Sequence, residues 1–209
     1  MLQRANPFNG LPRRYFRAIA ADPPQRFKSY TALQSANWHS RRDVEKHYPT
    51  MSIEEISALP VRDLAHPDGC HLFLWITGPN LTRAAEIITG WGFRYSAVAF
   101  VWVKLRRGFN QDQLFFTERD LHVGLGLTTR HNVEICLLAR RGNPRRLAKN
   151  VREIVVAPTR QHSRKPDEIF TRIEQYCDGP YLELFARAER PGWTGWENEV
   201  SRFNVAAVS

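Results

Sequence analysis

Short apolar runs rich in β-branched and aromatic residues recur along the whole chain. They cover residues 15–21, 71–76, 96–103, 133–139, 153–157 and 181–186. Most of these runs lack an alternation of apolar and polar positions, which is typical of strands that are covered on both faces. The pattern therefore predicts a parallel-type sheet between layers of helices.

Helical spacing appears between these runs. Four apolar residues, preceded by Asn80 as a predicted cap and followed by two glycines, predict a helix near residues 80–90: Leu81, Ala84, Ala85 and Ile88. Pro166 predicts the first turn of a second helix, which ends before Gly179. Ser52 and Glu55 form the capping-box pattern of a short helix over residues 52–58.

Strands interleaved with helices predict one α/β domain over residues 1–209, with 1–14 and 202–209 as peripheral tails. Two long polar segments, 28–50 and 105–130, each follow a predicted strand. Segments of this length inside a compact domain are usually functional or mobile. Since both follow strands, we expect them at the carboxyl-end edge of the sheet, where open α/β sheets bind ligands.

The charge of the chain favours a polyanionic partner. The formal net charge is +9, and arginine pairs occur at 41–42, 106–107, 140–141 and 145–146. Neutralising phosphates with such residues releases counterions, which favours binding to nucleic acid. A generally basic protein without a nucleic-acid role is the alternative.

Composition excludes several other classes. No apolar stretch has the length needed to cross a bilayer, so no membrane partner is expected. The N-terminus lacks the apolar core of a signal peptide, so we expect a cytoplasmic protein. Three scattered cysteines support neither a disulfide framework nor a zinc site, and the histidines lack metal-ligand spacing, so no metal is expected.

The sequence Ala-Asp-Pro-Pro at 21–24 directly follows the first predicted strand. Two prolines make the segment at the sheet edge rigid, because each has a fixed φ angle, and they leave nearby carbonyls with fewer hydrogen-bond partners in the chain, because neither has an N–H. We therefore expect the Asp22 carboxylate and the Pro23 carbonyl to point outward as acceptors. Together they could hold the hydrogens of an adenine amine and turn its lone pair towards a methyl donor. Asp22 must then face a cavity and not be buried in a salt bridge. The alternative is a turn that merely ends the strand.

Other polar residues also allow two interpretations. Glu183 lies inside an apolar run, where a carboxylate must be bound to a ligand or paired, for example with Arg187. Lys104 ends an apolar run and is either a ligand-binding residue or a solvated cation. The segment 162–165 precedes a helix and is compatible with a capping turn or with a cofactor contact.

The order of the motifs along the chain is more specific than any one motif. Asp22-Pro23-Pro24 is followed by His-Leu-Phe-Leu-Trp-Ile-Thr at 71–77, Val-Trp-Val-Lys at 101–104, His-Ser-Arg-Lys-Pro-Asp-Glu at 162–168, Glu-Leu-Phe-Ala-Arg at 183–187, Arg-Pro-Gly-Trp at 190–193 and Asn198. This series resembles the MT-A family, named for the 70-kDa subunit of the mRNA N6-adenosine methyltransferase. Its prokaryotic and phage members look most similar, and the resemblance covers roughly residues 15–200. It implies a Rossmann-like class I methyltransferase with permuted motif order, in which the catalytic motif precedes the cofactor motif.

The resemblance also implies a cofactor and a set of site residues. The cofactor is S-adenosylmethionine, and the residues implied to bind it are Ile19, Asp22, Lys104, Glu183, Phe185, Arg187 and Asn198. The catalytic motif is Asp22, Pro23, Pro24 and Gln25. In this assignment Asp22 contacts the target amine, Lys104 pairs with the carboxylate of the cofactor and Arg187 lies at its ribose.

Position 25 departs from the family pattern, which has Trp or another aromatic residue after Asp-Pro-Pro. An aromatic there should stack on the target base, a contact worth about 1–3 kcal/mol. Phe27, Tyr30 or Trp38 could compensate for it, or the amide of Gln25 could bond the base edge. Because Asp22 is intact, we expect an active enzyme, and we expect Gln25→Trp to leave activity unchanged or to raise it.

The target adenine must be flipped out of a duplex or be single-stranded, because base pairing hides its amine. The residues expected to contact nucleic acid are Lys28, Trp38, Arg41, Arg42, Arg106 and Arg107. The resemblance to prokaryotic members favours DNA over RNA, and a homodimer or heterodimer is compatible with the sequence. The alternatives are a catalytically silent partner subunit and a methyltransferase that acts on small molecules or proteins.

Overall fold

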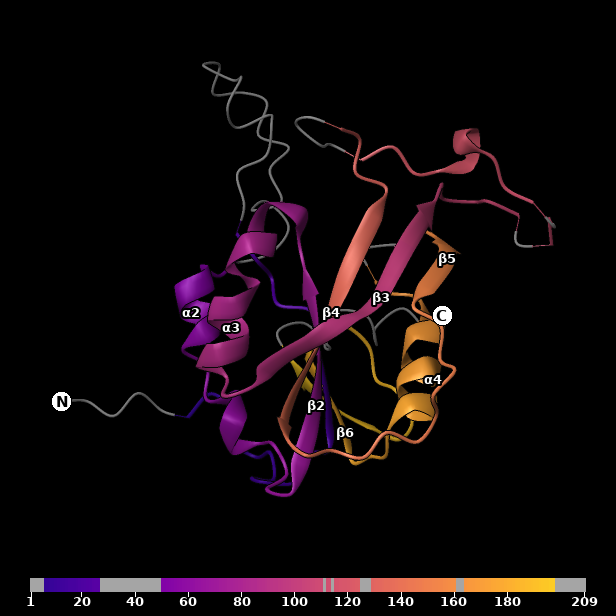
Figure 1. Ribbon diagram of the computed structural model, residues 1–209. Coiled ribbons are helices and arrows are strands. Elements are labelled where there is room, and N and C mark those ends of the chain that lie inside the picture. The colour runs from indigo at the N-terminus through magenta and orange to yellow at the C-terminus, as the bar shows by residue number, and fades with distance from the viewer. Residues whose placement is uncertain are drawn as a thin grey trace, which may run out of the picture.

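The computed structural model describes residues 6–26, 50–110, 112–113, 115–124, 129–160 and 164–197. The described residues form a seven-stranded sheet of order β5-β3-β4-β2-β1-β6-β7, with helices on both faces (Figure 1). The strands are β1 (Ala18–Ala21), β2 (Gly69–Ile76), β3 (Arg94–Leu105), β4 (Val133–Gly142), β5 (Ile154–Pro158), β6 (Tyr181–Ala186) and β7 (Trp193–Glu197). Each of the six predicted runs is therefore a strand. The sequence did not predict β7, because its short run alternates apolar and polar residues and contains a glycine.

One strand departs from the predicted parallel sheet. β4 pairs antiparallel with both of its neighbours, β2 and β3, whereas the other pairings in the sheet are parallel. The chain leaves β3 and enters β4 at the same edge, so β4 must run back across the sheet. The prediction of a parallel-type sheet is correct for six strands and wrong for this one.

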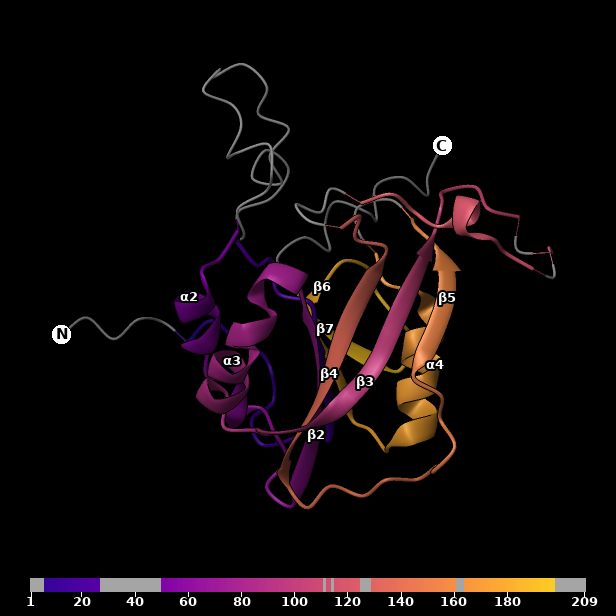
Figure 2. The same cartoon turned by 45° about the horizontal axis from the view of Figure 1, so that its top comes forward.

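The helices lie on opposite faces of the sheet and bury separate apolar clusters (Figure 2). On one face α2 (Ile53–Ser57) and α3 (Ala84–Gly90) cover the side of β1 that carries Ile19. On the other face α4 (Asp167–Tyr176) covers the side that carries Ala20. The three cysteines are buried and free, and three tryptophans are buried as packing residues: Trp75, Trp91 and Trp102. No helix among the described residues is long and apolar enough to cross a membrane.

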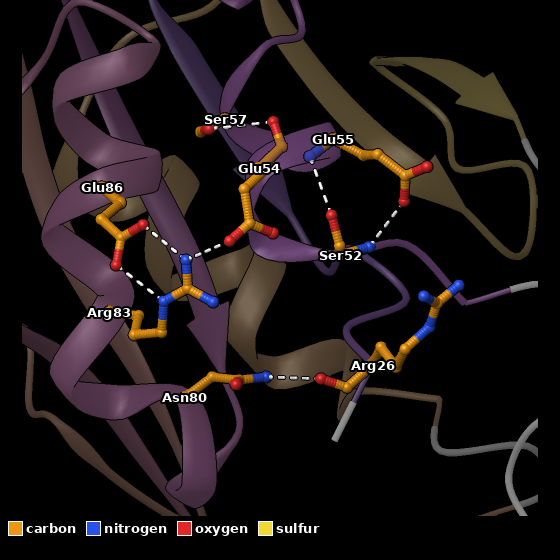
Figure 3. Close-up of polar contacts among 8 residues, drawn as sticks. All are labelled: Arg26, Ser52, Glu54, Glu55, Ser57, Asn80, Arg83 and Glu86. Atoms are coloured by element: carbon orange, nitrogen blue, oxygen red, sulfur yellow. Dashed lines mark hydrogen bonds and ion pairs between the residues drawn. The ribbon is translucent and has the colours of Figure 1, made fainter. Parts of the chain in front are cut away.

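The predicted helix starts are confirmed in two cases of three. Ser52 caps α2, and Glu55 returns the bond to the backbone of Ser52 in a capping box (Figure 3). Pro166 caps α4, one residue before the predicted start. Near residue 80 the prediction is wrong: Gly78–Arg83 is a 3-10 helix, Leu81 is exposed, and the buried side chain of Asn80 bonds to Arg26 and its neighbours instead of capping (Figure 3).

The order of the strands reverses between β1 and β6. These two strands are neighbours, but the chain continues from β1 to β2 on one side and from β6 to β7 on the other. At such a reversal, the carboxyl ends of the strands flank a crevice that binds ligands in open α/β sheets. Asp22 follows β1 and Arg187 follows β6 directly, so both residues lie at this crevice.

Candidate active site

A pocket opens at the reversal of the strand order, as the topology predicts. It encloses about 470 Å³, including space that is open to solvent. Its charged lining residues are Asp22, Arg164, Lys165, Glu183, Arg187 and Arg190. Its apolar lining residues are Ala20, Ala21, Trp75, Phe170, Phe185 and Ala188. The pocket therefore offers hydrogen-bond acceptors, cations and apolar surface within one space.

Asp22 lies in the wall of this pocket and also takes part in ion pairs. Its Oδ2 atom is 2.7 Å from the Nζ atom of Lys165 and 3.5 Å from a guanidinium nitrogen of Arg187. The side chain of Asp22 is 22% exposed, so the carboxylate is not sealed inside the protein. Both ion pairs use Oδ2, which leaves Oδ1 as the oxygen available for a ligand among the described contacts. The cavity required by the sequence prediction is present, together with a partly exposed salt bridge.

Lys165 connects Asp22 to a second partly buried carboxylate, that of Glu134. Its ammonium is 3.0 Å from Glu134 and 5.0 Å from the ring centroid of Trp75. Burial favours the neutral amine, but Asp22 and Glu134 raise the pKa of Lys165 above its ordinary value. Burial likewise opposes ionisation of Glu134, yet Lys165 and Lys104 lower its pKa to about 2. Lys165 and Glu134 are therefore both charged at neutral pH, and their mutual attraction holds the lysine beside Asp22.

Two residues assigned to the cofactor lie elsewhere. Lys104 pairs with Glu134 and lies 5.3 Å from the ring centroid of Trp102, and it does not line the pocket. Lys165 takes the position beside the pocket that the sequence had assigned to Lys104. Ile19 is fully buried in the cluster below α2 and α3, because alternate residues of β1 point to opposite faces. Neither Lys104 nor Ile19 is therefore among the residues that line the pocket, and the cofactor roles assigned to them stay predictions.

Glu183 lines the pocket as the resemblance implied. Burial raises the pKa of its carboxyl to about 7, although Arg190 opposes the shift. Among the described residues no hydrogen bond or salt bridge reaches this carboxyl, so the ion pair with Arg187 considered from the sequence is not formed. A partly buried carboxyl without such a partner at a pocket wall is suited to accept hydrogen bonds from a ligand.

Phe185 marks a backbone irregularity at the same edge. It has a φ of 61°, in the left-handed region that residues other than glycine rarely adopt. The pairing of β6 with β7 shifts register between Leu184 and Ala186, so Phe185 forms a bulge. Such strain costs about 1–3 kcal/mol and is concentrated at functional sites. Here it turns the chain out of β6 and towards Arg187 at the pocket.

The hydrogen bonds of the residues that follow Asp22 in the Asp-Pro-Pro-Gln segment differ from those that the sequence predicted. The amide of Gln25 is buried, with 5% of the residue exposed, and it bonds within the protein, so it does not face a target base. The Pro23 carbonyl accepts a hydrogen bond from the Gln25 N–H at 2.8 Å. The Pro24 carbonyl accepts one from the Met51 N–H at 2.8 Å. The Pro23 carbonyl, predicted to have few partners in the chain, thus accepts one hydrogen bond because the chain turns back at Gln25, and its role as an outward acceptor stays a prediction.

Positive charge gathers beside the pocket at the start of α4. Three guanidinium groups converge on the Asp167 carboxylate, at 2.8 Å from Arg160, 3.2 Å from Arg164 and 2.9 Å from Arg190. Burial opposes ionisation of Asp167, but its arginine partners hold its pKa well below the ordinary range. One carboxylate cannot balance three guanidiniums, so this cluster, which we call the arginine cluster, carries excess positive charge. Beyond the basic composition, no pattern in the sequence indicated it.

Several predicted nucleic-acid contacts are at the same edge or outside the described residues. Arg106 and Arg107 follow β3, whose carboxyl end lies at the edge that carries the pocket. Arg106 pairs with Asp120 at 3.1 Å, and Arg107 is exposed. The other predicted nucleic-acid contacts lie outside the described part of the chain: Lys28, Trp38, Arg41 and Arg42. Asn198, predicted to bind the cofactor, also lies outside it. Their roles stay predictions.

The fold and the pocket together define a class of protein. A mixed α/β sheet consistent with a Rossmann-like fold carries an acidic residue at its topological switch point, as in enzymes that bind an extended organic cofactor there. Residues 16–199 match the MT-A70 family. The chain belongs to this family of adenine N6-methyltransferases, which depend on S-adenosylmethionine, and it is a methyltransferase. The resemblance found from the motifs is confirmed.

Individual relatives differ in how much of their length the chain covers. It is 31% identical over 206 residues to the type II methyltransferase M.MunI of a Mycoplasma species, covering 92% of this chain and 81% of that protein. It is 30% identical to an N(6)-adenosine-methyltransferase MT-A70-like protein of Arabidopsis thaliana, covering 89% of this chain and 24% of that protein. It is 28% identical to the human N(6)-adenosine-methyltransferase catalytic subunit METTL3, covering 91% of this chain and 29% of that protein. The chain thus spans less than a third of the plant and human proteins.

Proposed function

We propose that this protein transfers a methyl group from S-adenosylmethionine to the N6 amine of adenine in nucleic acid, with DNA as the substrate rather than RNA. One observation carries the proposal. The Asp22 carboxylate, at the end of β1, shares a pocket with Glu183 and Arg187 of the neighbouring strand segment. In a chain of the MT-A70 family, this arrangement supports a role for Asp22 as the acceptor of the amine, next to groups suited to hold the cofactor.

The lining of the pocket fits the cofactor group by group. Acceptors at Asp22 and Glu183 suit its ammonium and its ribose hydroxyls, and the cations Lys165 and Arg187 suit its carboxylate and ribose. Apolar surface at Phe185 suits the flat adenine ring. When bound, the cofactor supplies a methyl group on a positively charged sulfur.

Asp22 has the central role in the transfer. The lone pair of an adenine amine is delocalised into the ring, so the amine is a poor nucleophile until its hydrogens are held by acceptors. With Oδ2 held by Lys165, Oδ1 is the atom that we assign to an amine hydrogen. The amine nitrogen forms a bond to the methyl group while the bond between that group and the sulfur would break and leave its electron pair on the sulfur, and the amine loses one N–H bond. Its proton goes to the Asp22 carboxylate, which is exposed enough to release it to solvent.

The arginine cluster and the residues after β3 support a nucleic-acid substrate. Arg164 lines the pocket and is 46% exposed, so it can meet a phosphate next to a flipped adenine. Arg106 and Arg107 add positive charge at the same sheet edge. DNA is favoured because M.MunI matches over most of its length, whereas the relatives named for adenosine, a ribonucleoside, match over less than a third.

A catalytically silent partner subunit is the second candidate, and a specific observation favours it. The aromatic residue expected after Asp-Pro-Pro is Gln25, which is buried, so stacking on the target base from this position is absent. Such a subunit would bind nucleic acid and act in a heterodimer, but it would show no turnover alone.

The deciding experiment measures transfer of labelled methyl from S-adenosylmethionine to single- and double-stranded DNA and to RNA of the same sequence. Nucleoside digestion and mass spectrometry then identify the product. N6-methyladenine formed in DNA, with less in RNA, supports the proposal. Cofactor binding with nucleic-acid binding but no transfer supports the silent partner. Cofactor binding with neither methyl transfer nor salt-dependent binding to nucleic acid contradicts both candidates.

A further inference from the structure

The amide of Gln25 is bonded at both ends to the carboxyl end of β2. Its Nε2 atom donates to the Trp75 carbonyl at 2.8 Å. Its Oε1 atom accepts from the backbone N–H of Thr77 at 3.1 Å, from the Thr77 hydroxyl at 3.2 Å and from Asn80 Nδ2 at 3.4 Å. The carbonyl requires a donor and the N–H requires an acceptor, so this orientation of the amide satisfies both.

The backbone around Gln25 is joined to the chain near Met51. The Met51 N–H donates to the Pro24 carbonyl at 2.8 Å, and the Arg26 N–H donates to the Met51 carbonyl at 2.9 Å. Asn80 Nδ2 donates to the Arg26 carbonyl at 3.2 Å (Figure 3). The segment after Asp22 is therefore tied to residue 51 by its backbone and to the end of β2 by the side chain of Gln25.

An aromatic residue could not make these bonds. Tryptophan has one donor and no acceptor, so the Thr77 N–H would lose its partner. An unsatisfied buried group costs about 1–3 kcal/mol, and the larger ring would also need space that this buried position lacks. Gln25 thus makes hydrogen bonds that an aromatic residue at position 25 of this chain could not make.

We propose that Gln25 is a positioning residue for methyl transfer, which sets the place of the Asp22 carboxylate in the pocket. The inference rests on the proposed function of Asp22. The link between the two is short and stiff: Pro23 and Pro24 have fixed φ angles, and the Gln25 N–H bonds the Pro23 carbonyl at 2.8 Å. A displacement at residue 25 is therefore passed on to residue 22.

Trp75 provides a second connection between Gln25 and Asp22. Its carbonyl accepts the hydrogen bond from Gln25, and its ring lies 5.0 Å from the ammonium of Lys165. That ammonium is the ion-pair partner of Asp22, at 2.7 Å. Gln25 thus acts on Asp22 through the backbone on one side and through Trp75 and Lys165 on the other.

The variant Gln25→Glu tests this role, because the hydrogen bonds of the introduced carboxyl depend on pH. When protonated, that carboxyl can donate to the Trp75 carbonyl and accept from Thr77, as glutamine does, and burial favours protonation. The ionised form cannot donate. We expect kcat relative to the native protein to fall about 10- to 100-fold near pH 8 and to recover near pH 5.5, with the KM for the cofactor changed less than about twofold.

The matched controls separate positioning from simple loss of structure. Gln175→Glu makes the same change at an exposed site on α4 and should keep native kcat at both pH values. Gln25→Met cannot regain the bonds and should lack the recovery at low pH. Gln25→Trp should lower kcat, contrary to the expectation from the sequence. Circular dichroism and thermal unfolding establish that each variant is folded.

The outcomes are distinguishable from a failure of the proposed function. Native kcat in folded Gln25→Met and Gln25→Trp, or a Gln25→Glu deficit that is the same at both pH values, would overturn the positioning role. If the native protein transfers no methyl group to nucleic acid, the proposed function itself fails. If Asp22→Asn keeps full activity, Asp22 is removed from the mechanism and the role of Gln25 with it. If Asp22→Asn is inactive while the Gln25 variants keep native kcat, only the role of Gln25 is lost.

Discussion

The Lys165 ammonium lies 2.7 Å from Asp22 Oδ2, although 143 positions separate the two residues along the chain. The contact forms because the segment before α4 crosses the carboxyl end of β1. It gives the Asp22 carboxylate a fixed orientation at the pocket, and it gives the buried lysine a counter-charge. The same contact determines what several substitutions should do.

Replacing Asp22 by asparagine should abolish methyl transfer. The amide keeps the shape of the side chain but lacks the charge that favours the amine and accepts its proton, so we expect a loss of at least about 100-fold in kcat. Transfer of labelled methyl measures it. Asp68→Asn, at a side chain that is 75% exposed, is the control and should keep native activity. Unchanged turnover in Asp22→Asn would remove this residue from the mechanism.

Replacing Lys165 by methionine should cost both activity and stability. Asp22 and Glu134 would lose the ammonium between them, and breaking such a buried pair costs about 3–5 kcal/mol. Lys104→Met should cost less, because Glu134 then keeps Lys165. Urea unfolding of the two variants at neutral pH measures the difference. Equal destabilisation by both would show that the partners of Glu134 are interchangeable.

The Glu183 carboxyl should make stability depend on pH. Its pKa is about 7 in the folded protein against 4.5 for the ordinary group. Between these two pH values the carboxyl is ionised in the unfolded chain but still protonated in the folded protein, so the free energy of unfolding falls as the pH rises. Above pH 7 this contribution has lowered the free energy of unfolding by about 3 kcal/mol relative to its value below pH 4.5. Glu183→Gln should therefore be more stable than the native protein at pH 8, with the gain vanishing below pH 4.5. Urea unfolding at several pH values tests this, with exposed Glu118→Gln as the control. A gain that does not vary with pH would contradict it.

Arg164 and Arg107 should contribute to nucleic-acid binding through charge alone. Each phosphate contact that is removed should reduce the slope of log affinity against log salt by about 0.9 for a duplex and about 0.7 for a single strand. Arg164→Ala and Arg107→Ala should each show this change, regardless of the sequence of the DNA. Fluorescence anisotropy at several salt concentrations measures it. Arg62→Ala, at an exposed arginine that precedes β2, should leave the slope unchanged.

The local elements of this protein were predictable because their signals are local. Continuous apolar runs mark buried strands, and a Ser-x-x-Glu pattern marks a helix start, whatever the rest of the chain does. The direction of β4 was not predictable in this way. It depends on the edge at which the chain re-enters the sheet after the long connection from β3.

Among the site residues, too, some could be predicted from local sequence and others could not. Asp22 was identifiable because a carboxylate at the end of an apolar run, followed by prolines, is a local signal. Lys165 lies before a helix, where the sequence was compatible with either a capping turn or a cofactor contact, and Lys104 was assigned to the carboxylate of the cofactor. Sequence spacing cannot show which of two lysines reaches a given carboxylate, because that depends on how β1, β4 and the segment before α4 meet in space.

By itself the amino-acid sequence determined six of the seven strands, two of the helix starts, the acid at the end of β1 and membership of the MT-A70 family. Only the tertiary structure decided that Asp22 pairs with Lys165, that Glu183 is partly buried without such a partner among the described residues, and that Gln25 bonds the end of β2 rather than a base. The physical reason is the separation along the chain over which each kind of interaction acts. Hydrophobic patterns and caps act between residues a few positions apart, whereas ion pairs, desolvation and the filling of a buried site depend on which distant segments the fold brings together.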